Sequence, residues 1–153
     1  MGKYFVMSTK FNKQHAEDFG LISNGNNTAL NPTDGSLWTK TNLYDFGWGK
    51  ENGYYKEPLP DFSSLLEITL YSKNRDDAFG AAAIILEQYP DELLIKCEQL
   101  MIDKKHKKDF QKLTEIFKLK IIINRSSVLN KTYSQIQSDF ERWHKVSDMA
   151  NKI

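Results

Sequence analysis

The sequence has one cysteine, no long apolar run and almost no net charge. Cys97 stands alone among 153 residues and cannot form an internal disulfide, which excludes a secreted domain stapled by disulfides. No stretch is apolar enough to cross a bilayer, and residues 1–20 contain no run that resembles the core of a signal peptide. We therefore expect a protein of the reducing cytoplasm that does not enter the membrane.

The sequence also lacks the usual signatures of catalysis. Asp45-Phe46-Gly47 matches the metal-binding tripeptide of protein kinases, but no glycine-rich strand loop, strand lysine or His-Arg-Asp loop precedes it. The glycine-rich residues 47–53 have neither phosphate-loop nor dinucleotide-loop spacing. No Gly-x-Ser-x-Gly elbow occurs in the chain. These absences exclude a kinase and argue against the common nucleotide-binding and serine-hydrolase sites.

The spacing that would indicate a metal site is missing as well. His15, His106 and His144 lie far apart, and no cysteine–histidine cluster has the spacing of a zinc site. Cys97 falls on an apolar helical stripe, which favours a buried structural thiol over a catalytic one. We therefore expect no cofactor and no metal, and the sequence favours a protein that is not an enzyme.

What is present is the composition of an ordinary folded domain. Hydrophobic residues make up 40% and charged residues 27% of the chain, and nine Phe, seven Tyr and three Trp argue against disorder. A length of 153 residues suits one domain. We predict a single domain over residues 1–153, in which an irregular segment, residues 1–60, packs on a helical region, residues 61–153.

The N-terminal segment shows little regular pattern. A short helix is expected between Phe11 and Ile22, and the Asn-, Gly- and Pro-rich residues 23–36 are typical of turns and loops. Residues 36–46 contain Trp, Thr and Tyr, which favour a strand or an extended segment. We expect little β-structure beyond this stretch.

Helical patterns begin at Asp61. This residue is a typical helix cap, Pro90 suits the first turn of a helix, and apolar residues recur at helical spacing from here onward. The expected helices are residues 61–73, 74–89, 91–101, 108–120 and 134–150. Short turns between helices favour antiparallel neighbours. We predict a mostly α fold, either a compact bundle or a HEAT-like stack of short helices over residues 61–150.

Residues 44–58, YDFGWGKENGYYKEP, combine aromatic rings, glycines and charges of both signs. Trp and Tyr dominate the energetics of protein interfaces, and glycine lets a partner approach the backbone closely. The predicted partner-binding residues are Tyr44, Asp45, Trp48, Glu51, Tyr54 and Tyr55. The alternative is that Phe46, Trp48 and Tyr54 turn inward and close the core, and both roles can coexist in one segment.

Charge is unevenly distributed along the chain. Residues 61–102 carry three basic and eight acidic side chains, whereas residues 103–153 carry twelve basic and six acidic ones. Such a dipolar chain can steer a partner, or its segments can complement each other within the fold. The densest basic cluster consists of Lys104, Lys105, Lys107, Lys108 and Lys112. The net charge is only +1 and no nucleic-acid-binding motif occurs, so nucleic acid is not an expected partner.

Two pairs of carboxylates stand at expected helix starts. Asp76-Asp77 and Asp91-Glu92 can cap their helices and interact favourably with the helix dipoles. Paired carboxylates can also perform acid–base or metal chemistry. Capping explains both pairs without a catalytic role.

Residues 76–86, DDAFGAAAIIL, and residues 89–94, YPDELL, resemble helical pairs in small bacterial proteins. Some of those proteins resemble immunity proteins, which are encoded beside polymorphic secreted toxins. The resemblance implies a cytoplasmic, non-enzymatic protein that binds a cognate toxin domain. It transfers no binding residue to this chain.

We therefore predict a protein-binding module, and the resemblance adds an immunity protein that neutralises a toxin domain. Two alternatives remain open. One is a small hydrolase whose site is assembled from scattered residues, such as His15, His144 and carboxylates. The other is a structural protein of a phage or mobile element. The sequence leaves the oligomeric state undetermined.

Overall fold

The computed structural model describes residues 2–7, 15–44 and 50–153, and at residues 44 and 50–52 it describes the backbone alone. The chain divides into two compact units, residues 1–84 (unit 1) and residues 85–153 (unit 2). The boundary falls inside α2 (Arg75–Gln88), so unit 1 contains the start of this helix and unit 2 its end. The single domain over residues 1–153 stays a prediction.

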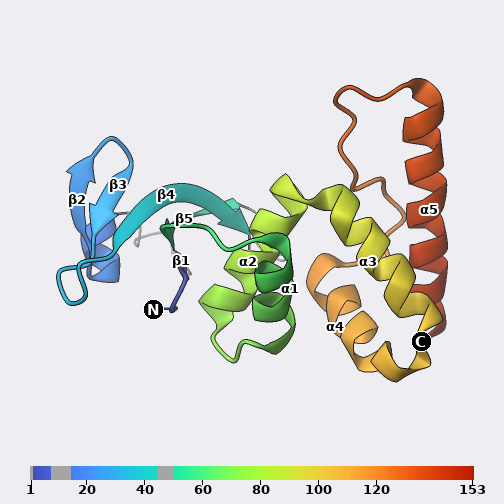
Figure 1. Cartoon of the computed structure of the whole chain (residues 1–153), viewed down its shortest axis with the longest axis horizontal. Helices are drawn as coiled ribbons and strands as arrows, with labels where there is room; N and C mark the ends of the chain where they lie inside the picture. The colour runs from blue at the N-terminus through green and yellow to red at the C-terminus, as the bar shows by residue number, and fades with distance from the viewer. Residues whose placement is uncertain (1, 8–14, 45–49) are drawn as a thin grey trace. The chain divides into compact units, whose positions relative to one another are not determined.

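Unit 1 is built on a five-stranded antiparallel sheet. Its strands are β1 (Phe5–Met7), β2 (Ile22–Gly25), β3 (Thr28–Leu30), β4 (Leu37–Tyr44) and β5 (Lys50–Lys56). Their spatial order is β1-β5-β4-β3-β2 (Figure 1). The strands from β2 to β5 follow one another as a meander, and β1 pairs with the free side of β5. The sheet therefore joins segments that lie far apart in the sequence.

This sheet corrects the predicted fold class. The chain is α+β, so the mostly α prediction, whether a bundle or a HEAT-like stack with little β, is wrong. The sequence pattern of β2 does not indicate a strand, because its residues are Ile-Ser-Asn-Gly and all four are exposed. β5 reads Lys-Glu-Asn-Gly-Tyr-Tyr-Lys, a polar segment with low strand propensity at its start. Hydrogen bonding to neighbouring strands, not apolar alternation, makes these segments extended.

The Asn- and Gly-rich stretch does form a turn, but that turn closes a β-hairpin. Asn26 and Asn27 have φ angles of 50° and 63°. Positive φ at both central residues is characteristic of the type I′ turn that joins two antiparallel strands, and Asn tolerates it better than most residues. A register shift between Ser23 and Gly25 marks a bulge beside this turn.

The described part of unit 1 also contains the 3-10 turn η1 (Ala16–Phe19) and two α-helical segments. α1 (Phe62–Tyr71) begins at the predicted cap, where the Asp61 side chain accepts a hydrogen bond from the Ser64 amide at 2.9 Å. In α2, Gly80 lies directly against the buried Phe5 of β1: an added Cβ at Gly80 would lie 2.4 Å from Phe5 Cγ. The absence of a side chain at Gly80 thus allows β1 to pack closely on the helix.

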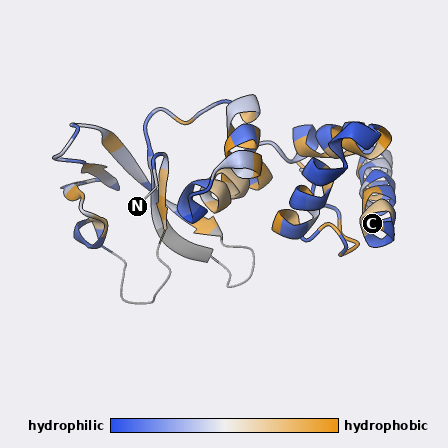
Figure 2. Ribbon diagram, turned by 90° about the horizontal axis from the view of Figure 1, so that it is seen from below, coloured by the Kyte–Doolittle hydropathy of each residue, from blue (hydrophilic) through white to orange (hydrophobic). Residues whose placement is uncertain are grey.

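Unit 2 is helical. It contains α3 (Pro90–Ile102), α4 (Lys107–Phe117) and α5 (Tyr133–Lys152), with the short 3-10 turn η2 (Lys104–His106) before α4. Hydrophobic and hydrophilic residues alternate around the turns of these helices (Figure 2). The buried side chains include Leu93, Cys97, Leu113, Trp143 and Val146. These helices fall where the apolar spacing predicted them, because the spacing records which face each helix buries.

Candidate functional site

The structure describes only part of the predicted partner-binding segment. Tyr44 pairs with Lys50 and Leu43 with Glu51, so Tyr44 and Glu51 lie in the backbone ladder between β4 and β5. Asp45 and Trp48 lie outside the residues that the structure describes, as do the side chains of Tyr44 and Glu51. The role of these four residues in binding a partner stays a prediction.

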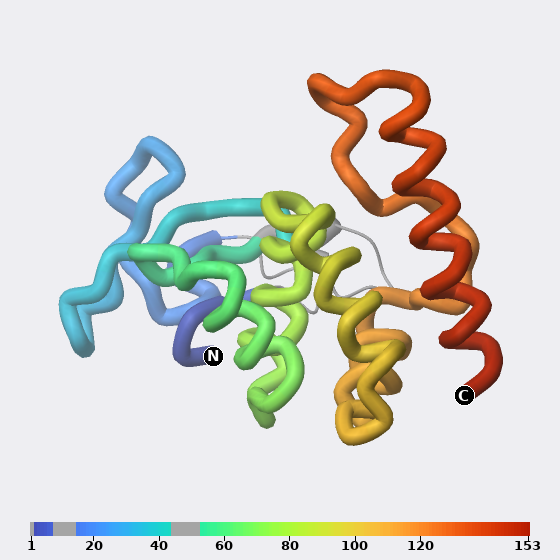
Figure 3. The backbone as a smooth tube through the Cα atoms, turned by 45° about the vertical axis from the view of Figure 1, so that its right-hand side comes forward, coloured from blue at the N-terminus to red at the C-terminus, as the bar shows by residue number. Residues whose placement is uncertain are grey.

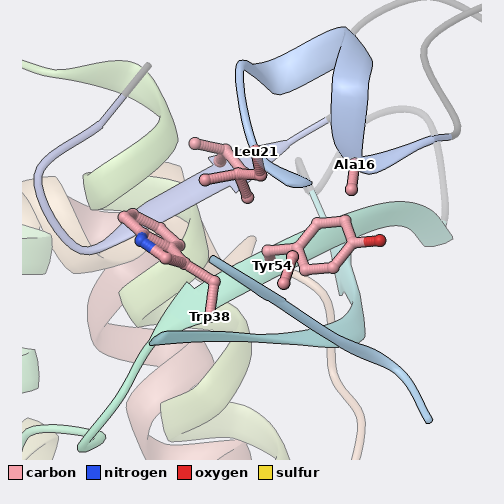
Figure 4. Close-up of a cluster of buried hydrophobic side chains, with 6 residues drawn as sticks. Ala16, Leu21, Trp38 and Tyr54 are labelled. Atoms are coloured by element: carbon pink, nitrogen blue, oxygen red, sulfur yellow. The ribbon is translucent and has the colours of Figure 1, made fainter. Parts of the chain in front are cut away.

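Tyr54 and Tyr55 occupy opposite faces of β5. Tyr54 is only 5% exposed and belongs to a buried cluster with Ala16, Leu21 and Trp38 (Figure 4). Tyr55 is half-buried. At Tyr54, therefore, the structure matches the alternative in which a ring of this segment turns inward. Its hydroxyl points past Ala16, away from Leu21 and Trp38 (Figure 4).

A more extensive surface candidate lies in unit 2, in the connection between α4 and α5. This connection, residues 118–132, is here named the α4–α5 loop, and it runs beside α5 (Figures 1 and 3). Apart from turns it has no regular secondary structure. Loops of this length without secondary structure are uncommon in compact domains and often functional.

Four residues of α5, spaced four apart, hold the backbone and polar groups of the α4–α5 loop. They are Asp139, Trp143, Ser147 and Asn151. Asn151 Nδ2 donates to the Lys120 carbonyl at 3.2 Å, and Ser147 Oγ donates to the Ile121 carbonyl at 3.2 Å. Residues four apart lie on one side of a helix. One helix side therefore supplies a polar contact on each successive turn.

The middle of the α4–α5 loop is held by the same side of α5. Trp143 Nε1 donates to Ser126 Oγ at 2.8 Å in a buried hydrogen bond. Nearer the start of α5, Lys131 Nζ lies 2.6 Å from Asp139 Oδ2 and 3.0 Å from Asp91 Oδ1 of α3. The hydrogen bond with Asp139 raises the pKa of Lys131, so its ammonium remains charged at neutral pH.

Arg125, a residue of the loop itself, binds backbone carbonyls near the start of the loop. Its Nη2 donates to the carbonyls of Lys118 at 2.7 Å and Ile121 at 3.0 Å, and its guanidinium lies 5.2 Å from the centre of the Trp143 ring. Lys118, the C-cap residue directly after α4, has a left-handed φ of 54°. Burial lowers the pKa of Arg125, but a guanidinium stays protonated at neutral pH. One side chain therefore ties the end of α4 to the start of the loop.

Contacts hold the loop at Lys118, Ile121 and Ser126, yet its apolar side chains face solvent. Leu129 is 78% exposed and Tyr133, the first residue of α5, is 82% exposed. The exposed apolar residues of this surface are Ile121, Ile122, Ile123, Val128, Leu129 and Tyr133. A concentration of exposed apolar residues on one segment often marks a protein interaction site. Residues 118–133 also contain four basic and no acidic side chains.

The two histidines named in the hydrolase alternative lie in different units. His15 belongs to unit 1, and His144 belongs to unit 2. His106 Nδ1 lies 2.8 Å from Asp103 Oδ2, while His144 Nε2 lies 3.7 Å from Asp148 Oδ1 on the exposed side of α5. In the described parts of the chain, no three His, Cys, Asp or Glu side chains are placed to hold a metal ion.

Cys97 and the acidic pairs have structural surroundings. Cys97 is fully buried, and burial raises the pKa of its thiol to about 12, as expected of an inert core cysteine. Asp77 and Asp76 accept hydrogen bonds from backbone amides of the N-terminal segment. Asp91 binds Lys131. None of these carboxylates faces another in an acid–base pair among the contacts described.

The lysine cluster of residues 104–112 lies on η2 and α4, and all five of its lysines are exposed. No helix in the described ranges combines the length and apolar character that crossing a membrane requires. Comparison with known proteins gave no match: no protein family, curated protein or solved structure is significantly similar to this chain.

Sequence reasoning missed the α4–α5 loop surface, although two signals were present. One is the run Ile121-Ile122-Ile123, which follows the end of a helical pattern and comes directly after Lys120. The other is the four-residue spacing of Asp139, Trp143, Ser147 and Asn151, which breaks the apolar face of α5 with polar groups. Neither signal says where the loop lies until the helix and loop are seen together.

Proposed function

We propose that this chain is a non-enzymatic protein-binding module that docks its partner on the α4–α5 loop. The observation that carries the proposal is that α5 and Arg125 hold the loop at several points while its apolar side chains stay exposed. Ordering a loop costs conformational entropy at the moment of binding, and a loop already held by α5 and Arg125 avoids part of that cost. Exposed Ile, Leu and Tyr side chains on such a frame support a binding role.

The charge of the loop points to an acidic partner. Two of its four cations, Arg125 and Lys131, bind groups within unit 2. Lys118 and Lys120 are exposed. Complementary charge accelerates association and selects among partners. The surface therefore suits a partner face that combines apolar side chains with carboxylates.

The finer form of the proposal is a cytoplasmic immunity protein that neutralises a toxin domain. The resemblance of residues 76–94 to helical pairs of such proteins supports this form. In this role the α4–α5 loop would bind the toxin domain and block its activity by covering its functional surface. Inhibition of this kind needs no catalytic group on the inhibitor.

The test looks for a toxin-like domain encoded beside this gene and uses that domain as the probe. A one-to-one complex in size-exclusion chromatography with light scattering is expected. The double variant Ile122→Asp/Leu129→Asp should weaken binding at least about thirtyfold, or about 2 kcal/mol, because both side chains would enter the interface.

Ile102→Asp is the matched control, because Ile102 is 83% exposed but lies at the end of α3, outside the α4–α5 loop. It should bind like the natural chain, and circular dichroism should show that all variants are folded. Equal loss of binding in the control and the loop variant would remove the proposed surface. Self-association of the chain without complex formation would favour a structural protein instead.

A further inference from the structure

Unit 1 contains a polar hollow that the protein-binding role does not use. Its cavity volume is about 260 Å³. It is lined by His15, Ala16, Glu17, Ser23, Gly25, Asn26, Asn27, Lys40 and Tyr54. These residues come from three places: the 3-10 turn η1 (Ala16–Phe19) with the residue before it, the β2–β3 hairpin, and the facing strands β4 and β5.

The walls of the hollow are held by backbone contacts. The Lys40 amide donates to the Asn27 carbonyl at 2.7 Å, which fixes the β2–β3 turn to β4. The Leu21 amide donates to the Ala16 carbonyl at 3.0 Å, which closes η1. Lys40 and Tyr54 are directly opposite each other in the ladder between β4 and β5, so their side chains leave the sheet on the same face. The hollow is thus a defined feature of unit 1.

Tyr54 is the residue that distinguishes this hollow from an ordinary surface depression. It is 95% buried, since only 5% of it is exposed, and it lines the hollow. Among the contacts of the described residues, none is a hydrogen bond to its hydroxyl. Buried hydroxyl groups almost always have a hydrogen-bond partner. Burial and the nearby Glu17 carboxylate raise the pKa of Tyr54, so the hydroxyl keeps its proton and can donate it to a ligand.

The charges around Tyr54 restrict the class of ligand. Glu17 and Lys40 line the same hollow with opposite charges, and neither has an ion-pair partner among the described residues. A ligand that is only an anion would meet Glu17, and one that is only a cation would meet Lys40. A small molecule with both charges satisfies both groups, and the side-chain amides of Asn26 and Asn27 add further donors and acceptors.

We propose that this hollow binds a small zwitterion of the α-amino-acid class. The ligand carboxylate binds Lys40, the ligand ammonium binds Glu17, and the Tyr54 hydroxyl donates to the ligand. The volume of the hollow admits a molecule of this size. The proposal is independent of the α4–α5 loop, which belongs to unit 2.

The experiment is an isothermal titration of the full chain with each standard L-amino acid in turn, with glucose as a neutral polar probe. At least one amino acid should bind with a Kd below about 1 mM, which corresponds to about −4 kcal/mol. For the tightest binder, N-acetylation or C-amidation should each weaken binding about tenfold or more. Tyr54→Phe should weaken it severalfold while leaving the unfolding temperature nearly unchanged, because the ring is retained.

Charge variants then assign the two ends of the ligand. With Lys40→Met, the amino acid and its C-terminal amide should bind with the same affinity. With Glu17→Gln, the amino acid and its N-acetylated form should bind with the same affinity. Lys73→Met and Glu67→Gln change exposed charges elsewhere in unit 1 and should leave both differences intact. The proposal is overturned if no amino acid binds by about 10 mM. It is also overturned if glucose binds as tightly as the amino acid, or if Lys40→Met and Glu17→Gln leave both differences unchanged.

Discussion

At the scale of the residue, one buried carboxylate decides how the N-terminal segment meets α2. Asp77 is 4% exposed, and it accepts hydrogen bonds from three consecutive amides, those of Lys3, Tyr4 and Phe5, at 2.8, 2.7 and 2.9 Å. Consecutive amides that converge on one anion form a backbone nest. The sequence explained this aspartate as a helix-start residue, and the structure adds a second role in anchoring the segment that leads into β1.

Asp77→Asn should destabilise unit 1 strongly. The amide nitrogen of Asn would face backbone donors, and the buried amides would lose acceptors, at a cost of about 1–3 kcal/mol. Urea unfolding followed by circular dichroism measures this cost. A loss below about 0.5 kcal/mol, the range of an ordinary surface change, would show that the nest contributes little.

The neighbouring Asp76 provides a contrast through its pH dependence. It accepts one long hydrogen bond, 3.3 Å from the Met7 amide, and burial raises its pKa. A carboxyl whose pKa is raised by folding favours the folded state while it is protonated, and this contribution is lost as pH rises through the folded pKa.

We therefore expect the stability of the natural chain to fall, relative to Asp76→Asn, as the pH rises above about 4. Urea midpoints of both proteins at several pH values measure the difference. Glu67→Gln, on the exposed side of α1, is the control and should show no such trend. A pH-independent difference between Asp76→Asn and the natural chain would contradict the direction of the shift.

The sign of the stability change caused by Gly80→Ala tests how closely α2 packs against Phe5. Alanine normally stabilises a helix interior relative to glycine by about 1 kcal/mol. Here the added Cβ would lie 2.4 Å from Phe5 Cγ and 2.6 Å from Phe5 Cβ, atoms near the root of a buried ring. Gly80→Ala should therefore destabilise the protein, by about 1–3 kcal/mol as for overpacking of a core.

The same substitution in a Phe5→Ala background tests the cause. Without the ring, Gly80→Ala should become neutral or stabilising, because only the helix propensity remains. Chemical denaturation of the four proteins of this cycle gives the coupling. If Gly80→Ala is equally harmful in both backgrounds, the contact with Phe5 is not its reason.

At the scale of the element, α5 serves two purposes on adjoining faces. Val146 and Ala150 lie in the core of unit 2, while Asp139, Trp143, Ser147 and Asn151 hold the α4–α5 loop. Trp143 belongs to both sets, since its ring is buried and its Nε1 binds Ser126. A helix that looks amphipathic in sequence is thus also the support of a long loop.

Arg125→Lys should loosen this loop without unfolding α5. A lysine keeps the charge but cannot reproduce the planar fork that reaches the carbonyls of Lys118 and Ile121. Amide hydrogen exchange at residues 121–129 should accelerate by about tenfold for each 1.4 kcal/mol of local stability lost. Amides in the middle of α5 should change little, and uniform acceleration across unit 2 would show a global effect instead.

At the scale of the whole molecule, opposite charges are distributed along a nearly neutral chain. The sequence places net negative charge in residues 61–102 and net positive charge in residues 103–153. Some of this charge is used inside unit 2, where Arg142 forms an ion pair with Glu98 and Lys131 binds Asp91. The remaining exposed cations support the acidic partner proposed above, and their effect should weaken with salt.

Cys97 is a built-in probe of the integrity of unit 2. It is fully buried, and its thiol has a pKa of about 12, so both access and ionisation disfavour reaction. A thiol reagent such as DTNB should not react with the native chain at neutral pH and should react fully in denaturant. Arg125→Lys should accelerate the labelling if the loop contributes to the stability of unit 2. Rapid labelling of the native chain would contradict the buried position.

The sequence by itself determined the helices from Asp61 onward and the burial of Cys97. Helical hydrogen bonds join residues four apart, so the cap Asp61, the first-turn Pro90 and the apolar spacing along each helix contain most of the required information. The sequence also indicated turn chemistry at Asn26 and Asn27. These features are local, and local patterns can be read without knowing what lies across the fold.

Only the tertiary structure decided the sheet, the α4–α5 loop surface and the polar hollow. β1 pairs with β5, and Asp77 binds amides more than seventy residues earlier in the chain. The loop surface depends on α5 holding a segment of different sequence, and the hollow gathers η1, a hairpin turn and two strands. Strand pairing and side-chain convergence arise between distant segments, and the pattern of one segment does not record its partner.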